Sequence, residues 1–271
     1  EEAKPRLREF KAQELSNTAW AYATAKHEAV ALFDAMAEEA TMRLREFNEQ
    51  ALSNTFWAYA TAKHHAPRLF DAIAAEAMTR PSELTAQALS NVVWACATAK
   101  HAAPTLFDAV AKEAIPRLRE FNAQALSNTI WAYATACHVD ARLFTALARS
   151  AEWCVNDFNS QDLLNTAWAF AKVGQLDAKL FASLARSFIG RPLDDLTAPQ
   201  IAKAAWGFAK ADQLDGPLFT ALARSAEQRL SDFSAQDLAD IAWAFANAGQ
   251  LDAKLFASLA RSAEQLLDTF T

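Results

Sequence analysis

Large apolar residues recur along the chain with one period. Tryptophans stand 37 residues apart, with a single interval of 38, at Trp20, Trp57, Trp94, Trp131, Trp168, Trp206 and Trp243. A phenylalanine follows each tryptophan by thirteen residues, and Phe or Leu precedes each by ten. Three markers that keep phase through seven copies indicate an internal repeat. The predicted repeats are 10–46, 47–83, 84–120, 121–157, 158–195, 196–232 and 233–269.

The polar positions inside each repeat predict two helices. A capping residue nine positions before the Trp opens the first helix, as at Asn122, Asn159, Thr197 and Ser234. An acid three positions later, as at Asp162, completes a capping box. The first helix is expected to end near Gly174 or Gly249, since glycine is typical of the position that follows a helix.

The second helix has start and stop signals of its own. Its predicted first residues are marked by Asp177, Asp215 and Asp252 as N-caps, or by Pro67 and Pro104 in the first turn. Pro5 and Pro116 fall late in this helix and are expected to end or kink it. Gly190 and Pro192 mark a helix end near the one longer interval.

Burial decides how the helix pairs assemble. Leu126, Ile130 and Tyr133 form an i, i+4, i+7 stripe on the first helix, and the second helix carries a similar stripe. A lone pair cannot cover both stripes, whereas stacked pairs bury a continuous core. We therefore predict an all-α fold, an αα-hairpin solenoid (superhelix) of seven repeats of 37–38 residues. Residues 1–9 resemble 112–120, so they are interpreted as the end of a preceding repeat's second helix in a longer array.

Composition and charge narrow the classes of function. The chain is 52% hydrophobic, yet charged residues interrupt every apolar run, which excludes a membrane span. The net charge of -6 excludes a strongly basic nucleic-acid clamp as a description of the whole chain, though not a local basic stripe. Three cysteines without a pairing pattern indicate a reducing compartment.

Signals of catalysis are absent from the sequence. It contains no glycine-rich phosphate loop, no HExxH, no GxSxG and no Cys/His metal spacing. We predict no enzyme activity, catalytic residue, cofactor, metal or small-molecule substrate. Histidines seven positions after four tryptophans are interpreted as polar residues at helix ends, Cys96 as a core residue, and Trp153 as a packing residue.

A first row of polar residues stands three positions before each Trp: Asn17, Asn54, Asn91, Asn128, Asn165, Lys203 and Asp240. Seven positions later, on the same helix face, come Thr24, Thr61, Thr98, Thr135, Lys172, Lys210 and Asn247. One interpretation is that this face lines the concave surface and reads one base or one backbone unit per repeat. The other is that the asparagines join neighbouring helices. Both interpretations are open.

A second row stands eighteen positions after the Trp, on the second helix: Lys112, Arg149, Arg186, Arg224 and Arg261. One cation per repeat could follow a phosphate backbone. The alternative is that acids nearby, such as Asp108 four positions before Lys112, pair with these cations.

The core of the repeat resembles a known family. Residues 126–134 read LSNTIWAYA, and the pattern Leu-x-Asn-x-x-Trp-Ala-x-Ala recurs in all seven repeats, with Ile201, Lys203, Gly207 and Asp240 as departures. This pattern is similar to the octotricopeptide repeat family of organellar helical-repeat proteins. The resemblance implies binding of chloroplast or mitochondrial transcripts and control of their stability, processing or translation. It also implies a targeting peptide outside this segment.

The sequence thus predicts a single-stranded RNA-binding module that contacts about one nucleotide per repeat. The RNA or a peptide would contact the asparagines of the first row together with Lys203, Asp240, Lys172 and Lys210. The second row would bind phosphates. The alternative is a protein-interaction scaffold, or a peripheral subunit of an organellar assembly, that binds an extended peptide.

Overall fold

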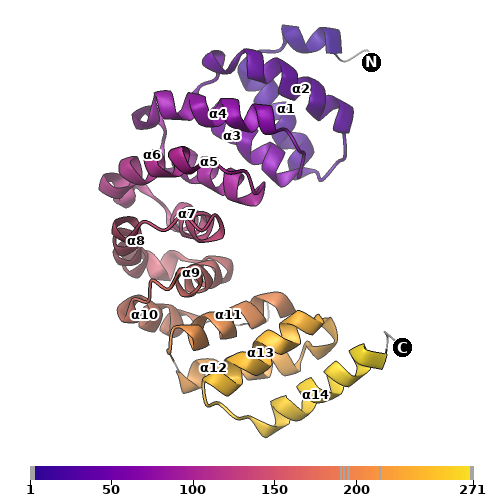
Figure 1. Cartoon of the computed structure of the whole chain (residues 1–271), viewed down its shortest axis with the longest axis vertical. Helices are drawn as coiled ribbons and strands as arrows, with labels where there is room; N and C mark the ends of the chain where they lie inside the picture. The colour runs from indigo at the N-terminus through magenta and orange to yellow at the C-terminus, as the bar shows by residue number, and fades with distance from the viewer. Residues whose placement is uncertain (1–3, 190, 192, 194–195, 214, 269–271) are drawn as a thin grey trace. The chain divides into compact units, whose positions relative to one another are not determined.

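The computed structural model describes residues 4–189, 191, 193, 196–213 and 215–268, and every regular element within them is helical (Figure 1). The helices come in pairs, and within each compact part of the chain adjacent pairs pack in sequence order. The predicted fold class, an all-α solenoid of αα-hairpins, is confirmed. No helix within the described ranges is long and apolar enough to cross a bilayer.

Two compact units divide the chain. Unit 1 comprises residues 1–146, and unit 2 comprises residues 147–271. The helix α8 (Ala141–Cys154) contains the boundary. Each unit is a stack of hairpins with its own core.

Unit 1 has two layers of helices. The first helices lie side by side in one layer: α1 (Ala12–Thr24), α3 (Glu49–Thr61), α5 (Ala86–Thr98) and α7 (Ala123–Thr135). The second helices form the other layer: α2 (Val30–Met42), α4 (Pro67–Thr79) and α6 (Pro104–Ala114). Short 3-10 turns link each pair to the next: η1 (Lys4–Glu9), η2 (Leu44–Glu46), η3 (Pro81–Glu83) and η4 (Ile115–Glu120).

Unit 2 repeats this arrangement. Its first helices are α9 (Ser160–Val173), α11 (Ala198–Lys210) and α13 (Ala235–Asn247), and its second helices are α10 (Ala178–Ile189), α12 (Gly216–Glu227) and α14 (Ala253–Asp268). The connecting turns are η5 (Val155–Asp157) and η6 (Leu230–Asp232). A Cβ atom at Gly207 would lie 3.3 Å from the backbone nitrogen of Trp168, so α11 approaches α9 closely at this departure from the repeat pattern.

The predicted helix boundaries are well supported by the capping contacts. The side chains of Asn122 and Asn159 accept hydrogen bonds from backbone N–H groups in the first turns of α7 and α9, and Asp162 completes a capping box. Asp177 and Asp252 accept in the same way at α10 and α14. At Pro116, α6 gives way to η4, as predicted. The expectation for Gly190 and Pro192 falls outside the described residues.

The ends of the first helices show a difference between the units. In unit 2, Gly174 and Gly249 adopt left-handed φ angles of 69° and 64° after the helix, as predicted. In unit 1, the equivalent residues are Lys26, Lys63, Lys100 and Cys137, with φ angles of 52°, 53°, 53° and 54°, and in the remaining repeat of unit 2 the residue is Asp212, with a φ angle of 54°. A residue with a Cβ atom is strained in this region. Three repeats of unit 1 therefore keep a lysine where the backbone favours glycine.

Buried hydrogen bonds connect successive pairs in unit 1. The Tyr59 and Tyr133 hydroxyls each donate to a carbonyl in the preceding pair, Tyr59 to Phe33 and Tyr133 to Phe107, at 2.7 Å. Burial raises the pKa of both tyrosines, so the hydroxyls stay protonated donors. These bonds join α2 to α3 and α6 to α7.

Candidate nucleic-acid interface

The seven in-register tryptophans, hereafter the tryptophan row, lie on the surface of the first-helix layer. Trp20 is 46% exposed and Trp243 is 43% exposed, while the other five are half-buried. In unit 1, the ring centroids of Trp57 and Trp94 are 6.3 Å apart, and those of Trp94 and Trp131 are 6.4 Å apart. In unit 2, those of Trp206 and Trp243 are 6.5 Å apart. Three successive indole rings therefore step regularly in unit 1, and two neighbouring rings do so in unit 2.

The asparagines three positions before each Trp lie on the same exposed helix face. The side chain amide of Asn17 accepts a hydrogen bond of 2.9 Å from Gln13, one turn earlier. Gln87 and Asn91 make the same bond at 2.9 Å, as do Gln161 and Asn165 at 2.7 Å. In the last repeat, Gln236 donates to Asp240 at 2.9 Å. These bonds hold the predicted contact residues in place within their own helices.

In unit 1, hydrogen bonds that cross between first helices come from serine, whereas in unit 2 Asn247 donates to the Ala209 carbonyl at 3.2 Å and Gln200 donates to Gln161. Ser16 and Ser90, both fully buried, donate to the carbonyl oxygens of Ala51 and Ala125 in the next first helix, each at 3.0 Å. These serines stand directly before the asparagines. The observed connection between helices thus belongs to a neighbouring row, while the role of the asparagines stays a prediction.

The position four residues after the Trp differs between the units. In unit 1, the Oγ1 atoms of Thr61, Thr98 and Thr135 are buried and have no hydrogen-bond partner among the described residues, so the hydroxyls point away from the surface. In unit 2, the Nζ atom of Lys172 lies 4.7 Å from the centre of the Trp168 ring, a cation-π contact. Lys203 and Lys210 are exposed on α11. Cations therefore stand beside the indoles of unit 2.

The second predicted row lies on the other helical layer. Lys112, Arg149, Arg186, Arg224 and Arg261 are all exposed on second helices. None of them forms an ion pair within the described parts of the chain; Asp108 instead lies 2.9 Å from His138. The exposed face of each layer points away from the other layer. The predicted base-contacting row therefore lies on first helices and the predicted phosphate-contacting row on second helices.

A different set of arginines has a structural role that sequence reasoning missed. Arg43, Arg80 and Arg117 each donate to a backbone carbonyl 33 residues earlier, at Phe10, Phe47 and Leu84, where their repeat begins. Arg191 makes the equivalent bond to Phe158 in unit 2. Hydrogen bonding from Arg43 also lowers the pKa of Glu46. The signal was present in the sequence, because these arginines stand 23 residues after their tryptophans.

The histidines pair with acids of the preceding repeat. The Nε2 atoms of His64, His101 and His138 each lie 2.9 Å from the Oδ1 atoms of Asp34, Asp71 and Asp108, respectively. The backbone N–H groups of the same histidines also bond carbonyls at the ends of the first helices. Within the ranges that the structure describes, no three His, Cys, Asp or Glu residues gather as metal ligands would.

Two single residues have opposite outcomes. Cys96 is fully buried, as predicted for a core residue, and burial raises its pKa to about 12. The prediction for Trp153 was wrong, because this side chain is 82% exposed on α8 instead of packed. Its position late in a second helix, out of register with the tryptophan row, turns it toward solvent.

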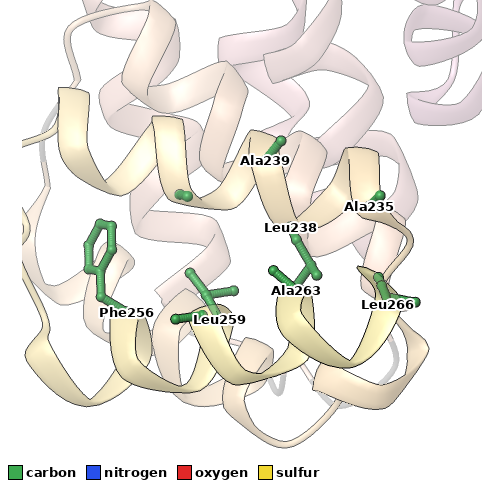
Figure 2. Close-up of a pocket in the computed structure, with 9 residues that line it drawn as sticks. Ala235, Leu238, Ala239, Phe256, Leu259, Ala263 and Leu266 are labelled. Carbon is green, nitrogen blue, oxygen red and sulfur yellow. The ribbon is translucent and has the colours of Figure 1, made fainter. Parts of the chain in front are cut away.

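An apolar groove of about 440 Å³ lies between α13 and α14 (Figure 2). Figure 2 shows Leu238 and Leu259 projecting into it from the two helices. Its other lining residues are alanines, Phe256 and Leu266, so it offers no polar group to orient a substrate. The equivalent residues of earlier repeats, such as Leu163 and Leu184, are buried by neighbouring pairs. The groove therefore reflects hairpin packing and has none of the chemistry of an active site.

Fold and surface together define the class: an αα-hairpin repeat protein that displays aromatic and polar side chains along one helical layer. The family model described as RNA-editing substrate-binding complex 6 protein matches residues 4–252, and the chain belongs to this family. None of the curated proteins matches the chain. The match supports the predicted class, a helical family associated with RNA, but the family matched is not the octotricopeptide family.

Proposed function

We propose that this chain binds single-stranded RNA along the exposed face of its first helices, at about one nucleotide per repeat. The observation that carries the proposal is the tryptophan row, with rings stepping by 6.3 and 6.4 Å in unit 1. Aromatic side chains on a groove surface stack with bases irrespective of sequence. The asparagines, Lys203, Asp240, Lys172 and Lys210 flank these rings and would contact base edges or the strand backbone.

The position of each cation on the first or second helices favours some predicted cations over others for this interface. Lys172, Lys203 and Lys210 stand on the first-helix layer beside Trp168 and Trp206. The arginine row of the second layer faces elsewhere, so a strand that lies on the tryptophan row would not reach it. The arginine row would bind phosphates only if the RNA strand also wrapped around the second helices.

The family match supports an RNA-related role or a subunit role in a complex. We propose that the chain contributes binding to an RNA-editing substrate-binding complex and catalyses no reaction itself. The match favours the mitochondrion, while nothing supports the chloroplast. A protein-contacting scaffold is the competing function, because the same amide-lined face suits an extended peptide.

Binding of random single-stranded RNA tests the proposal directly. A labelled RNA of about 20 nucleotides should bind at micromolar protein, and its affinity should fall steeply between about 50 and 200 mM salt. A peptide contact through amides would depend on salt only weakly. Absence of RNA binding at low salt would remove this function and leave the scaffold.

The tryptophan row supplies a second test with a matched control. Stacking is worth about 1–3 kcal/mol per base, so Trp57→Ala with Trp94→Ala should weaken RNA binding roughly a hundredfold. Phenylalanine at both positions should restore most of the affinity. Trp153→Ala, which removes an exposed tryptophan outside the row, should leave RNA affinity unchanged. Equal losses from both alanine variants would show that the row is not the interface.

A further inference from the structure

A set of lysines follows the first helices of unit 1. Lys26, Lys63 and Lys100 each stand six residues after a Trp of the row and two after a Thr, just beyond the helix end. All three are exposed and form no ion pair among the described residues. We call them the lysine row. Its members lie about 9 Å along the helix axis from their indoles.

The lysine row stands at a backbone position where a Cβ atom carries strain. Their φ angles of 52°, 53° and 53° lie in the left-handed region, where a Cβ atom is unfavourable. Gly174 and Gly249 fill the same position in two repeats of unit 2 at φ angles of 69° and 64°, whereas Cys137 and Asp212 fill it in the two other repeats, both at 54°. A strained residue that the fold would replace with glycine points to a task for its side chain.

The charges around the lysine row leave it free to act. The carboxylates of Asp34 and Asp71 are engaged by His64 and His101, at 2.9 Å, and not by the lysines. The exposed first-helix face of unit 1 otherwise presents uncharged side chains at its Gln, Asn, Trp and Thr positions. The lysine row thus places one positive charge just beyond the first helix in three repeats of this unit.

We propose that Lys26, Lys63 and Lys100 bind the phosphates of a single RNA strand whose bases stack on the tryptophan row of unit 1. This inference rests on the proposed function and adds the backbone contacts that the second-layer arginines are not placed to make. One ammonium per repeat matches one phosphate per nucleotide. Each contact releases counterions when RNA binds.

The variant Lys63→Gly with Lys100→Gly tests the proposal, because it should change stability and binding in opposite directions. Relief of two left-handed residues should raise Tm by about 2–5 °C. Loss of two phosphate contacts should weaken RNA binding roughly tenfold at low salt and reduce the slope of log affinity against log salt by about 1.4.

Two controls separate charge from backbone effects. Cys137 occupies the same position in the fourth repeat with φ 54°, so Cys137→Gly should raise Tm without any loss of RNA affinity. Lys112→Gln removes a cation from the second layer and should leave the salt slope intact.

The outcomes distinguish this inference from the function on which it rests. If the unaltered chain binds no RNA, the proposed function fails. If it binds RNA and the double glycine variant binds equally well with the same salt slope, the lysine row is not a phosphate site and only this inference is overturned.

Discussion

The repeats of unit 1 are nearly identical in sequence, whereas those of unit 2 differ from one another. All four unit 1 repeats share five polar residues around the Trp. Gln, Ser and Asn stand seven, four and three positions before it, and Thr and His stand four and seven positions after it. In unit 2, the position three before the Trp is Asn165, Lys203 or Asp240, and no two of its repeats present the same surface. One unit thus offers the same contact site four times, and the other offers three different sites.

The change of sequence type coincides with the change of packing unit. The second helices of the first three repeats carry Asp34, Asp71 and Asp108, but α8 has Thr145 at this position. Asp140 also caps α8 in the manner of Asp177, through hydrogen bonds from nearby backbone N–H groups. The boundary between the units follows Ala146.

Residues that meet across a repeat interface change together. Where the histidine is kept, the preceding repeat supplies an aspartate, as His64 and Asp34 show. In unit 2, Gln250 replaces the histidine and Thr220 stands where that aspartate would be. The residues that vary together therefore belong to the interface between two adjacent hairpins and not to a single repeat. This is expected when each repeat contacts only its neighbours.

The largest structural effect is expected at an arginine of unit 1. Arg117 bonds the Leu84 carbonyl and the carboxylates of Glu113 and Glu120, so Arg117→Ala should destabilise unit 1 by about 2–3 kcal/mol. The exposed Arg186 of unit 2 bonds only the Ser183 hydroxyl among the described residues, and its alanine variant should change stability by less than about 0.5 kcal/mol.

The alkylation rates of two cysteines would show which unit the Arg117→Ala change destabilises. Cys96 in unit 1 is buried, and burial raises the pKa of the Cys154 thiol in unit 2 to about 11. Arg117→Ala should therefore speed the alkylation of Cys96 and leave that of Cys154 unchanged. Equal acceleration at both thiols would mean that the two units open as one.

The next effect concerns RNA sequence and depends on the proposed function. Four identical sites in unit 1 should prefer a run of identical bases, so one homopolymer should bind about tenfold more tightly than a mixed sequence, given ~1 kcal/mol or more per mismatch. Asn54→Lys with Asn91→Lys, which copies the Lys203 site, should reduce this preference. Equal affinity for all homopolymers and for mixed RNA would indicate that stacking alone determines binding.

Much of this architecture follows from the sequence because periodicity determines it. Helix pairs, their N-caps at Asn122 and Asn159, and the left-handed Gly174 all depend on local patterns that the chain shows directly. The exposure of the tryptophans could also be predicted from the sequence. The apolar stripe of Leu126, Ile130 and Tyr133 occupies the opposite side of the helix from Trp131.

Other features depend on contacts between repeats that no single period reveals. The spacing of Arg43 and Arg117 is visible in the sequence, but their carbonyl partners are set by how η2 and η4 fold back. The lysines recur in phase in the sequence, but only the φ angles of Lys63 and Lys100 distinguish them from ordinary surface charge. The exposure of Trp153 depends on what packs against α8, which is a tertiary property.

A smaller effect is expected from the buried tyrosines. Tyr133→Phe removes the 2.7 Å hydrogen bond to the Phe107 carbonyl and should cost about 1–1.5 kcal/mol. Unit 2 already has Phe170, Phe208 and Phe245 at this position and contains no such bond to lose. Urea unfolding with an unchanged m-value would measure the loss, and a variant as stable as the parent would show that the bond contributes nothing.

The smallest expected effect is a difference in stability between alanine variants of two serines, each four positions before a Trp. Ser90 donates across to the Ala125 carbonyl at 3.0 Å, while Ser53 donates to Gln50 within its own helix at 3.3 Å. Both alanine variants gain the same helix propensity. Ser90→Ala should therefore be less stable than Ser53→Ala by about 0.5–1 kcal/mol, because only it loses a bond between helices. The difference stays small because the Ala125 carbonyl keeps the hydrogen bond from the Thr129 hydroxyl at 2.7 Å. Unit 2 replaces this serine with Leu164, Ala202 and Ala239, so equal stabilities would mean that no hydrogen bond from this position is needed to join the first helices in either unit.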